Sequence, residues 1–166
     1  MSGQTIVLDH ERVQRKLTRI IHQLHEEYHA EEGIVLVGVA PRGFAIAQRL
    51  KEGLATATRL KVELVEIELD KDQPLERPAK LSVDPETLRD RVVVLVDDVL
   101  MSGRTLMHAA SFLVQVPLKR LTTVVLVDRR HRAYPIRADI VGLTLSTTVQ
   151  EHISVRLGRT DSVYLS

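Results

Sequence analysis

Residues 93–105 read VVLVDDVLMSGRT, and this stretch decides how the chain folds. Its apolar beginning is typical of a strand buried on both faces of a parallel sheet. That strand delivers two adjacent carboxylates, Asp97 and Asp98, and the short loop Met101–Thr105 then leads into a helix. In open α/β sheets, ligands bind just beyond the carboxyl ends of the strands. The stretch therefore predicts an α/β fold with a ligand site at this strand end.

Strand-like and helical apolar patterns alternate along the rest of the chain. Apolar residues at helical spacing follow a possible cap at Asp9. The predicted helices cover Val13–Tyr28, Phe44–Ala55 and Leu106–Val116. The predicted strands cover Ile34–Val39, Val62–Leu69, Arg91–Val96, Leu121–Val127, Asp139–Leu143, Ile153–Leu157 and Ser162–Leu165. Such alternation indicates an open, mainly parallel sheet flanked by helices, in a single domain over residues 1–166.

One segment, Asp70–Glu86, breaks this alternation. It has three prolines, many charged residues and few apolar ones. A loop of this length in a compact domain is usually either a functional lid or disordered, and the sequence favours neither alternative.

Composition narrows the class of protein. The chain has 166 residues, a net charge of +1, no cysteine and only 3% aromatic residues. The lack of cysteine excludes disulfides, thiolate metal sites and a cysteine nucleophile. The chain shows neither an apolar run of membrane-spanning length nor a signal sequence, so we expect a soluble cytoplasmic protein with no membrane partner.

The loop after the acid pair has the composition of an anion cradle. Gly103 allows a close backbone approach, while Ser102, Thr105 and the free N–H groups of a helix start supply donors. Two carboxylates would repel a bare phosphate, but they accept hydrogen bonds from hydroxyls or face a bound cation. A ribose diol that carries a phosphate satisfies both halves. A purely structural alternative, a solvated acid pair beside a capped helix, does not explain all thirteen residues in this order.

The stretch resembles the phosphoribosyl diphosphate (PRPP) motif of type I phosphoribosyltransferases. The resemblance implies the fold of that family, with a small hood region and a flexible lid loop at about residues 70–86. It implies that Asp97 and Asp98 bind the ribose hydroxyls. It also implies that the loop wraps the 5′-phosphate, through Met101, Ser102, Gly103, Arg104 and Thr105.

The same resemblance assigns a second loop, Ala40–Gly43, to pyrophosphate. Pro41, Arg42 and Gly43 follow the first core strand, where the family places its pyrophosphate loop. Such loops often hold a cis peptide, and an X–Pro bond adopts one most readily. The alternative for Arg42 and Gly43 is a plain turn into a helix.

Three further segments indicate which branch of the type I phosphoribosyltransferases the chain resembles. They are Leu17–Ile20 with His22, Val96–Leu100 with Gly103–Thr105, and Leu126–Asp139, which reads LVDRRHRAYPIRAD. From about Val7 to Gly142 the chain is similar to the pyrimidine operon attenuation protein/uracil phosphoribosyltransferase family. The resemblance implies a Mg²⁺-dependent pentosyltransferase that joins uracil to PRPP and releases UMP and pyrophosphate.

The family's properties imply further roles. Lys71 is the candidate lid cation, and Asp97 would contact Mg²⁺ through water. The base would lie on the backbone of Ile140, Val141 and Gly142. Enzymes for 6-oxopurines usually have an acid at the position of Met101, so a pyrimidine acceptor is favoured. Two departures concern the base and the lid: the family's lysine after Val-Gly is Leu143 here, and its Tyr-Arg-Asp-Asp is Asp-Lys-Asp-Gln at 70–73.

A regulatory alternative stays open. Members of the family bind pyrimidine-operon mRNA in some bacteria, and six residues match that role: Thr18, Arg19, His22, His131, Arg132 and Arg137. Arginines could meet RNA phosphates. The bland alternative is a solvated helix face and a surface loop, since glutamates dilute the basic residues. A PRPP- or nucleotide-sensing RNA-binding regulator with weak catalysis is therefore the second hypothesis. By resemblance we also expect a homo-oligomer.

Overall fold

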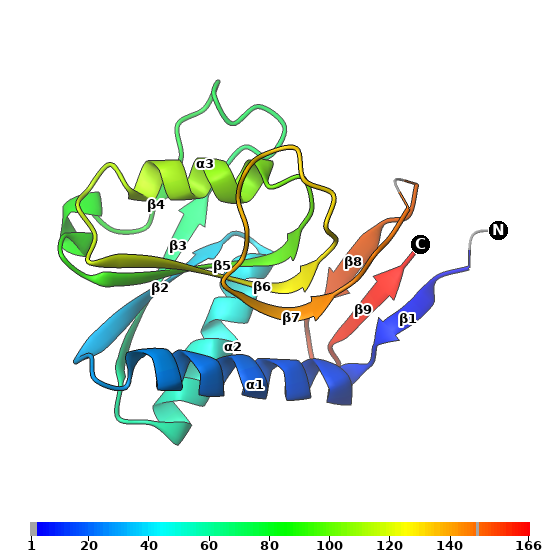
Figure 1. Ribbon diagram of the computed structural model, residues 1–166, viewed down its shortest axis with the longest axis horizontal. Helices are drawn as coiled ribbons and strands as arrows, with labels where there is room; N and C mark the ends of the chain where they lie inside the picture. The colour runs from blue at the N-terminus through cyan, green and yellow to red at the C-terminus, as the bar shows by residue number, and fades with distance from the viewer. Residues whose placement is uncertain (1–2, 149) are drawn as a thin grey trace.

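A six-stranded sheet forms the centre of the molecule (Figure 1), as the computed structural model of residues 3–148 and 150–166 shows. Its strand order is β4-β3-β2-β5-β6-β7, and every neighbouring pair except β3 and β4 is parallel. The strands are β2 (Gly33–Val39), β3 (Lys61–Glu68), β4 (Lys80–Leu81), β5 (Val92–Leu100), β6 (Arg120–Asp128) and β7 (Ile140–Thr144). The predicted open, mainly parallel α/β sheet is confirmed.

Helices cover both faces of this sheet. One face carries α3 (Arg104–Leu113), and the other carries α1 (His10–Tyr28) and α2 (Arg42–Ala57) (Figure 1). Side chains of β2 alternate between the two layers: Ile34 and Leu36 pack with α1 and α2, whereas Val35 and Val37 pack on the side of α3. The central strands are buried on both faces, as their continuous apolar sequences predict.

A second, three-stranded sheet lies beside the first and forms the small hood region. It joins β1 (Thr5–Leu8), β9 (Ser162–Leu165) and β8 (Ile153–Arg156), in that order and all antiparallel. The sequence pattern did not indicate β1. The last two strands, which the pattern does predict, form a hairpin whose free edge pairs with this N-terminal strand.

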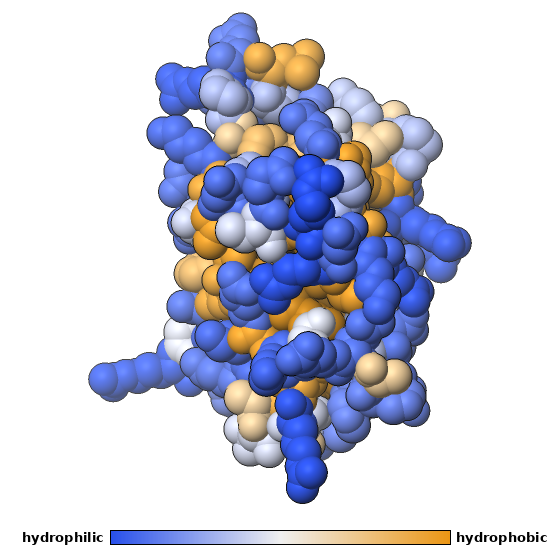
Figure 2. All heavy atoms as spheres, turned by 90° about the vertical axis from the view of Figure 1, so that its left-hand side faces the viewer, coloured by the Kyte–Doolittle hydropathy of each residue, from blue (hydrophilic) through white to orange (hydrophobic). Residues whose placement is uncertain are grey.

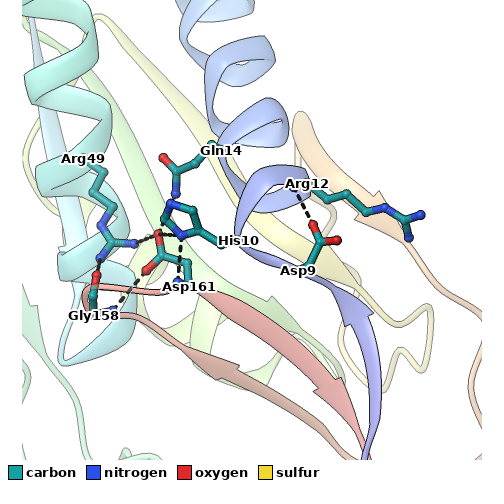
Figure 3. A network of polar contacts seen from close by, with 7 residues as sticks. All are labelled: Asp9, His10, Arg12, Gln14, Arg49, Gly158 and Asp161. Carbon is teal, nitrogen blue, oxygen red and sulfur yellow. Dashed lines mark hydrogen bonds and ion pairs between the residues drawn. The ribbon is translucent and has the colours of Figure 1, made fainter.

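A buried carboxylate ties the small sheet to the two helices beneath the main sheet (Figure 3). Asp161, just before β9, is 1% exposed and forms an ion pair with Arg49 of α2. Gln14 of α1 donates to Asp161 Oδ2 at 2.7 Å, and the Asp161 N–H donates to His10 Nδ1 at 2.9 Å. Burial raises the pKa of Asp161, but the hydrogen bonds from Arg49 and Gly158 outweigh it, so the net pKa is lowered. The carboxylate therefore stays charged and holds three elements together.

The first helix begins where its sequence predicts. The Asp9 carboxylate accepts a hydrogen bond from the Arg12 N–H at 2.9 Å (Figure 3), which satisfies one of the free donors at the helix start.

Residues 70–86 were predicted as one long loop, but the part without regular structure is shorter than expected. Its second half contains β4, which pairs with β3, and the 3₁₀ helix η1 (Pro85–Leu88), which Asp84 caps. In the first half, Asp70 Oδ1 accepts hydrogen bonds from the N–H groups of Asp72 and Gln73. The open part therefore lies between β3 and β4.

Figure 2 shows the end of the molecule at which β5 and β6 begin. Its surface is mostly hydrophilic, and apolar atoms show in narrow gaps between polar side chains. Among the described residues, no helix is long and apolar enough to cross a membrane.

A glycine sets how closely α2 approaches the end of β2. A Cβ atom on Gly38 would lie 2.4 Å from Phe44 Cα and 2.8 Å from its backbone nitrogen. Backbone cannot move aside as a flexible side chain can, so a larger residue here displaces the start of α2 and the loop before it.

We expect Gly38→Ala to lower the free energy of unfolding by about 1–3 kcal/mol, the usual cost of overpacking a core. Denaturant unfolding measures this. Gly158→Ala is the matched control, because a Cβ there meets nothing within 4 Å, and its change is expected to stay within about 0.5 kcal/mol. Equal effects of the two substitutions would contradict the inference that Gly38 is required for the close approach of α2 to β2.

Candidate functional site

The two neighbouring acids lie inside β5 rather than after it. Pairing with β6 continues as far as Leu100 and Asp128, so the strand extends past the predicted end at Val96. Asp97 is 4% exposed and Asp98 is 6% exposed. The Asp98 N–H donates to Asp97 Oδ1 at 2.8 Å. Pairing with β6 thus continues past the acid pair and holds the two carboxylates within a buried strand.

Burial makes the charge on Asp97 costly. Desolvation raises the pKa of Asp97 well above its ordinary value, and the adjacent Asp98 carboxylate raises it further. The charge of Lys71 acts in the opposite direction but does not outweigh these effects.

The loop after β5 turns at a position that only glycine suits. Gly103 is the N-cap of α3 and has φ of 86°, in the left-handed region. A Cβ atom there would also meet Ile136 Cγ2 at 2.7 Å. Ser102 Oγ accepts from the Arg104 N–H at 3.2 Å. The predicted loop therefore does open a helix, with the backbone close to the cavity.

The loop after β2 approaches the acid pair from the other side. The Ala40–Pro41 peptide is cis, in agreement with the expectation for this loop. A Cβ atom on Gly43 would lie 2.6 Å from Val96 O, so glycine lets α2 start against β5. Arg42 then reaches across, and its Nε donates to Asp98 Oδ2 at 2.8 Å.

These loops surround a cavity of about 360 Å³, within the usual range for small-molecule sites. The structure brings nearly all the predicted PRPP residues together in its wall. The predicted residues that line it are Arg42, Lys71, Asp97, Asp98, Met101, Ser102, Gly103, Arg104 and Thr105. Pro41 and Gly43 shape the loop behind Arg42 and do not line the cavity.

Polar residues that the sequence analysis did not assign to this site also line the cavity. Arg129 directly follows β6, and His152 lies just before β8, with Ile153 as the first residue of that strand. Arg129 stands in the basic segment LVDRRHRAYPIRAD, so its charge was visible in the sequence but its burial was not. His152 and Ile153 reach the cavity only because the small sheet folds back over the main one, which no local pattern indicates.

The predicted base residues lie elsewhere. Ile140, Val141 and Gly142 are on β7, the edge strand, and β6 separates them from the acid pair on β5. Arg19 Nη2 donates to Val141 O at 2.8 Å and to Gly142 O at 2.6 Å, so both carbonyls are already bonded to α1. The structure does not bring these three residues to the cavity.

The six residues considered for RNA fall into different environments. Thr18 and His22 line a separate groove between α1 and α2. His131 hydrogen-bonds the carbonyl of Thr147. Arg132 donates to the Ile136 and Met101 carbonyls, both at 2.9 Å, and to the Asp128 carboxylate at 2.7 Å. Arg137 is exposed, and Arg19 bonds β7 as described above. Arg132 thus braces the loop after β5 rather than facing solvent alone.

Within residues 3–148 and 150–166, no group of three or more His, Cys, Asp or Glu side chains is placed to hold an ion. Asp97 and Asp98 supply carboxylate oxygens of the kind that Mg²⁺ prefers, and a bound substrate would have to supply further oxygens.

Comparison with known proteins agrees with this geometry. Residues 3–158 match the model of the phosphoribosyl transferase domain. The "Bifunctional protein PyrR" of Clostridium kluyveri is 36% identical over 97% of this chain and 94% of its own length. Its counterpart in Bacillus mycoides is 38% identical, with the same coverage.

Solved structures share the fold at lower identity. A hypoxanthine phosphoribosyltransferase of Trypanosoma cruzi aligns with a TM-score of 0.76 and 19% identity, over 96% of this chain and 95% of its own. A hypoxanthine-guanine phosphoribosyltransferase of Bacillus anthracis aligns with a TM-score of 0.70 and 22% identity, over 85% and 82%. Together with the family match, these similarities show that the chain belongs to the type I phosphoribosyltransferases and is a PyrR-like member of that family.

Proposed function

We propose that this protein transfers the 5-phosphoribosyl group of PRPP to a pyrimidine base, with uracil as the acceptor, and releases UMP and pyrophosphate. The observation that carries the proposal is the order of charged side chains along the carboxyl ends of neighbouring strands. Lys71 follows β3, Arg42 follows β2, and Asp97 and Asp98 end β5. Cations therefore lie on one side of an acid pair that has the anion cradle of α3 above it.

This order fits the three parts of PRPP. Arg42 and Lys71 would neutralise the pyrophosphate, the two acids would accept hydrogen bonds from the ribose hydroxyls, and Ser102 to Thr105 would hold the 5′-phosphate. A charge-assisted hydrogen bond of this kind contributes about 1.5–3 kcal/mol. In the structure Arg42 pairs with Asp98, so binding of pyrophosphate would require it to exchange or share this partner.

The residues fit Mg²⁺ as a partner of PRPP. Asp97 is a buried carboxyl group, and within the described chain it accepts one hydrogen bond, from the Asp98 N–H, so its oxygens have capacity for further donors. Ribose hydroxyls or a water on Mg²⁺ would complement it. When bound, the ion would neutralise charge on the departing pyrophosphate.

The acceptor is argued from Met101 and from the similarity to PyrR proteins. Met101 lines the cavity where purine enzymes of the family usually carry an acid, and a thioether cannot transfer a proton. The sequence similarity to the uracil family covers most of the chain, whereas the purine enzymes share only the fold, at 19–22% identity.

Turnover tests the proposal directly. The protein is incubated with PRPP, Mg²⁺ and, in separate reactions, uracil, cytosine, orotate, hypoxanthine and guanine, and released pyrophosphate is measured. We expect turnover with uracil, and chromatography should identify UMP. Turnover with a purine alone would overturn the proposed acceptor. Silence with every base, together with salt-sensitive binding of a structured RNA, would favour the regulatory alternative, for which the name of the relatives, bifunctional, leaves room.

Asp98→Asn removes the charge that is proposed to bind ribose. We expect kcat/KM for PRPP to fall about 10- to 100-fold, because an amide accepts a weaker hydrogen bond than a carboxylate. Steady-state kinetics at saturating uracil measure this. Glu26→Gln makes the same chemical change on the exposed face of α1 and is expected to leave kcat/KM unchanged. A loss shared by both variants would show that the effect is not local.

Asp97→Asn tests whether the site is built at the expense of stability. The pKa of Asp97 is raised in the folded protein by desolvation and by Asp98. In the unfolded chain this carboxyl group ionises with its ordinary pKa of 3.8, so at higher pH its ionisation favours the unfolded state. Asparagine keeps the oxygen that accepts from the Asp98 N–H. We therefore expect the variant to unfold at a higher denaturant concentration than wild type at pH 7, while PRPP binding weakens.

The sign of this stability difference depends on pH. Below pH 3.8 both forms carry no charge at residue 97, and the advantage of the variant should disappear. Equilibrium unfolding across this pH range measures the difference. A variant that is less stable at pH 7 than at low pH, relative to wild type, would contradict the assignment.

A further inference from the structure

The cavity contains a buried cation that the proposed grip on PRPP does not use. Arg129 is 3% exposed, although arginine is almost never fully buried unless it is paired. Among residues 3–148 and 150–166, no carboxylate forms an ion pair with it. Glu151 is near enough for the charge of Arg129 to help lower its pKa, but it does not reach ion-pair distance, and a desolvated charge in this position is costly.

Hydrogen bonds satisfy one side of the guanidinium and leave the other side poorly satisfied. Nε donates to Thr147 Oγ1 at 2.9 Å, and Nη2 donates to the carbonyls of Thr148 and Glu151. Nη1 donates to the sulfur of Met101 at 2.7 Å. A thioether is a weak acceptor, and Nη1 carries a second N–H for which the described residues provide no partner. The cavity edge of this cation is therefore the part that lacks an acceptor.

The position of Arg129 in the sheet indicates which part of the substrate it meets. Along the strand order β3-β2-β5-β6, the loops that end the strands carry Lys71, Arg42, the acid pair and then Arg129. The pyrophosphate and the base leave and join the same carbon, C1′, from opposite sides of the ribose. If Lys71 and Arg42 face pyrophosphate, the base lies on the side of β6, against Arg129 and Ile153.

We infer that the Nη1 edge of Arg129 binds a carbonyl oxygen of the pyrimidine and stabilises the base as an anion during transfer. This inference rests on the proposed function and deepens it. In the step, the bond between C1′ and the pyrophosphate oxygen breaks, and its electron pair leaves with pyrophosphate. The N1 atom forms the new bond to C1′ with its own electron pair, and the N1 proton passes to water.

The chemistry of the cavity supports an anionic acceptor. A pyrimidine that loses its N1 proton spreads negative charge onto its two carbonyl oxygens. Met101 cannot accept that proton, so stabilisation of the anion by a fixed cation replaces a general base. Because Arg129 is buried, it interacts with such a charge more strongly than an exposed arginine would.

The experiment compares two acceptors that differ in acidity. The bases are uracil and 5-fluorouracil, whose ring N–H is more acidic because fluorine withdraws electrons. In Arg129→Met, we expect kcat/KM to fall about 100-fold for uracil and about 10-fold for 5-fluorouracil, because the more acidic base needs less help. The KM for PRPP should stay within about twofold of the wild-type value.

Two further variants separate charge from structural support. Arg129→Lys keeps the charge but loses the fork that bonds Thr147 and Glu151, so we expect lower rates with a wild-type ratio between the two bases. Arg130→Met is the matched control, since this exposed neighbour does not line the cavity, and it should change neither rate. If Arg129→Met does not fold, Arg129→Gln replaces it, because glutamine also removes the charge.

The outcomes are distinct. An unchanged ratio between the two bases in the charge-removing variant, or an equally changed ratio in Arg129→Lys, would overturn the role of Arg129 while the proposed function stands. A wild-type protein that is silent with both pyrimidines would overturn the proposed function and this inference with it.

Discussion

Strand β5 is hydrogen-bonded through its last residues, and this pairing forces two neighbouring carboxylates into the interior of the protein. β6 continues the ladder to Leu100, and the start of α2 lies against Asp97 at a distance that only Gly43 permits. The acids therefore cannot turn outward to solvent. Much of the remaining site compensates for this burial: Arg42 crosses from the neighbouring loop to Asp98, and the positive charge of Lys71 opposes the rise in the pKa of Asp97.

Signals that are local in sequence were sufficient for the parts of the fold nearest this strand. The apolar runs of β2, β5 and β6 predict a parallel sheet because both of their faces are buried, and the Asp9 cap predicts the start of α1. The loop from Met101 to Thr105 is recognisable because glycine and hydroxyl residues at the start of a helix are suited to binding an anion. Most of the residues expected to contact PRPP accordingly line one cavity.

What the sequence could not indicate depends on contacts between distant segments. β1 has only four residues and gains its partner from the end of the chain, so no periodicity marks it. The same return of the chain brings His152 and Ile153 to the cavity, whereas the expected base residues, Ile140 to Gly142, belong to an edge strand whose carbonyls bond Arg19. Sheet order, which places these three residues on the edge strand and not beside the acid pair, is not encoded locally.

The basic run after β6 shows how burial changes the meaning of a charge. From sequence, Arg129, Arg130 and Arg132 form a single cluster suited to phosphates. In the structure Arg130 is exposed, Arg132 fastens Asp128 to the Met101 carbonyl, and Arg129 lies in the cavity wall. Both of the latter contact Met101, so the loop proposed for the ribose phosphate and the side of the cavity proposed for the base are mechanically joined. Met101 is thus the residue through which a base bound at Arg129, as proposed, would contact the donor loop.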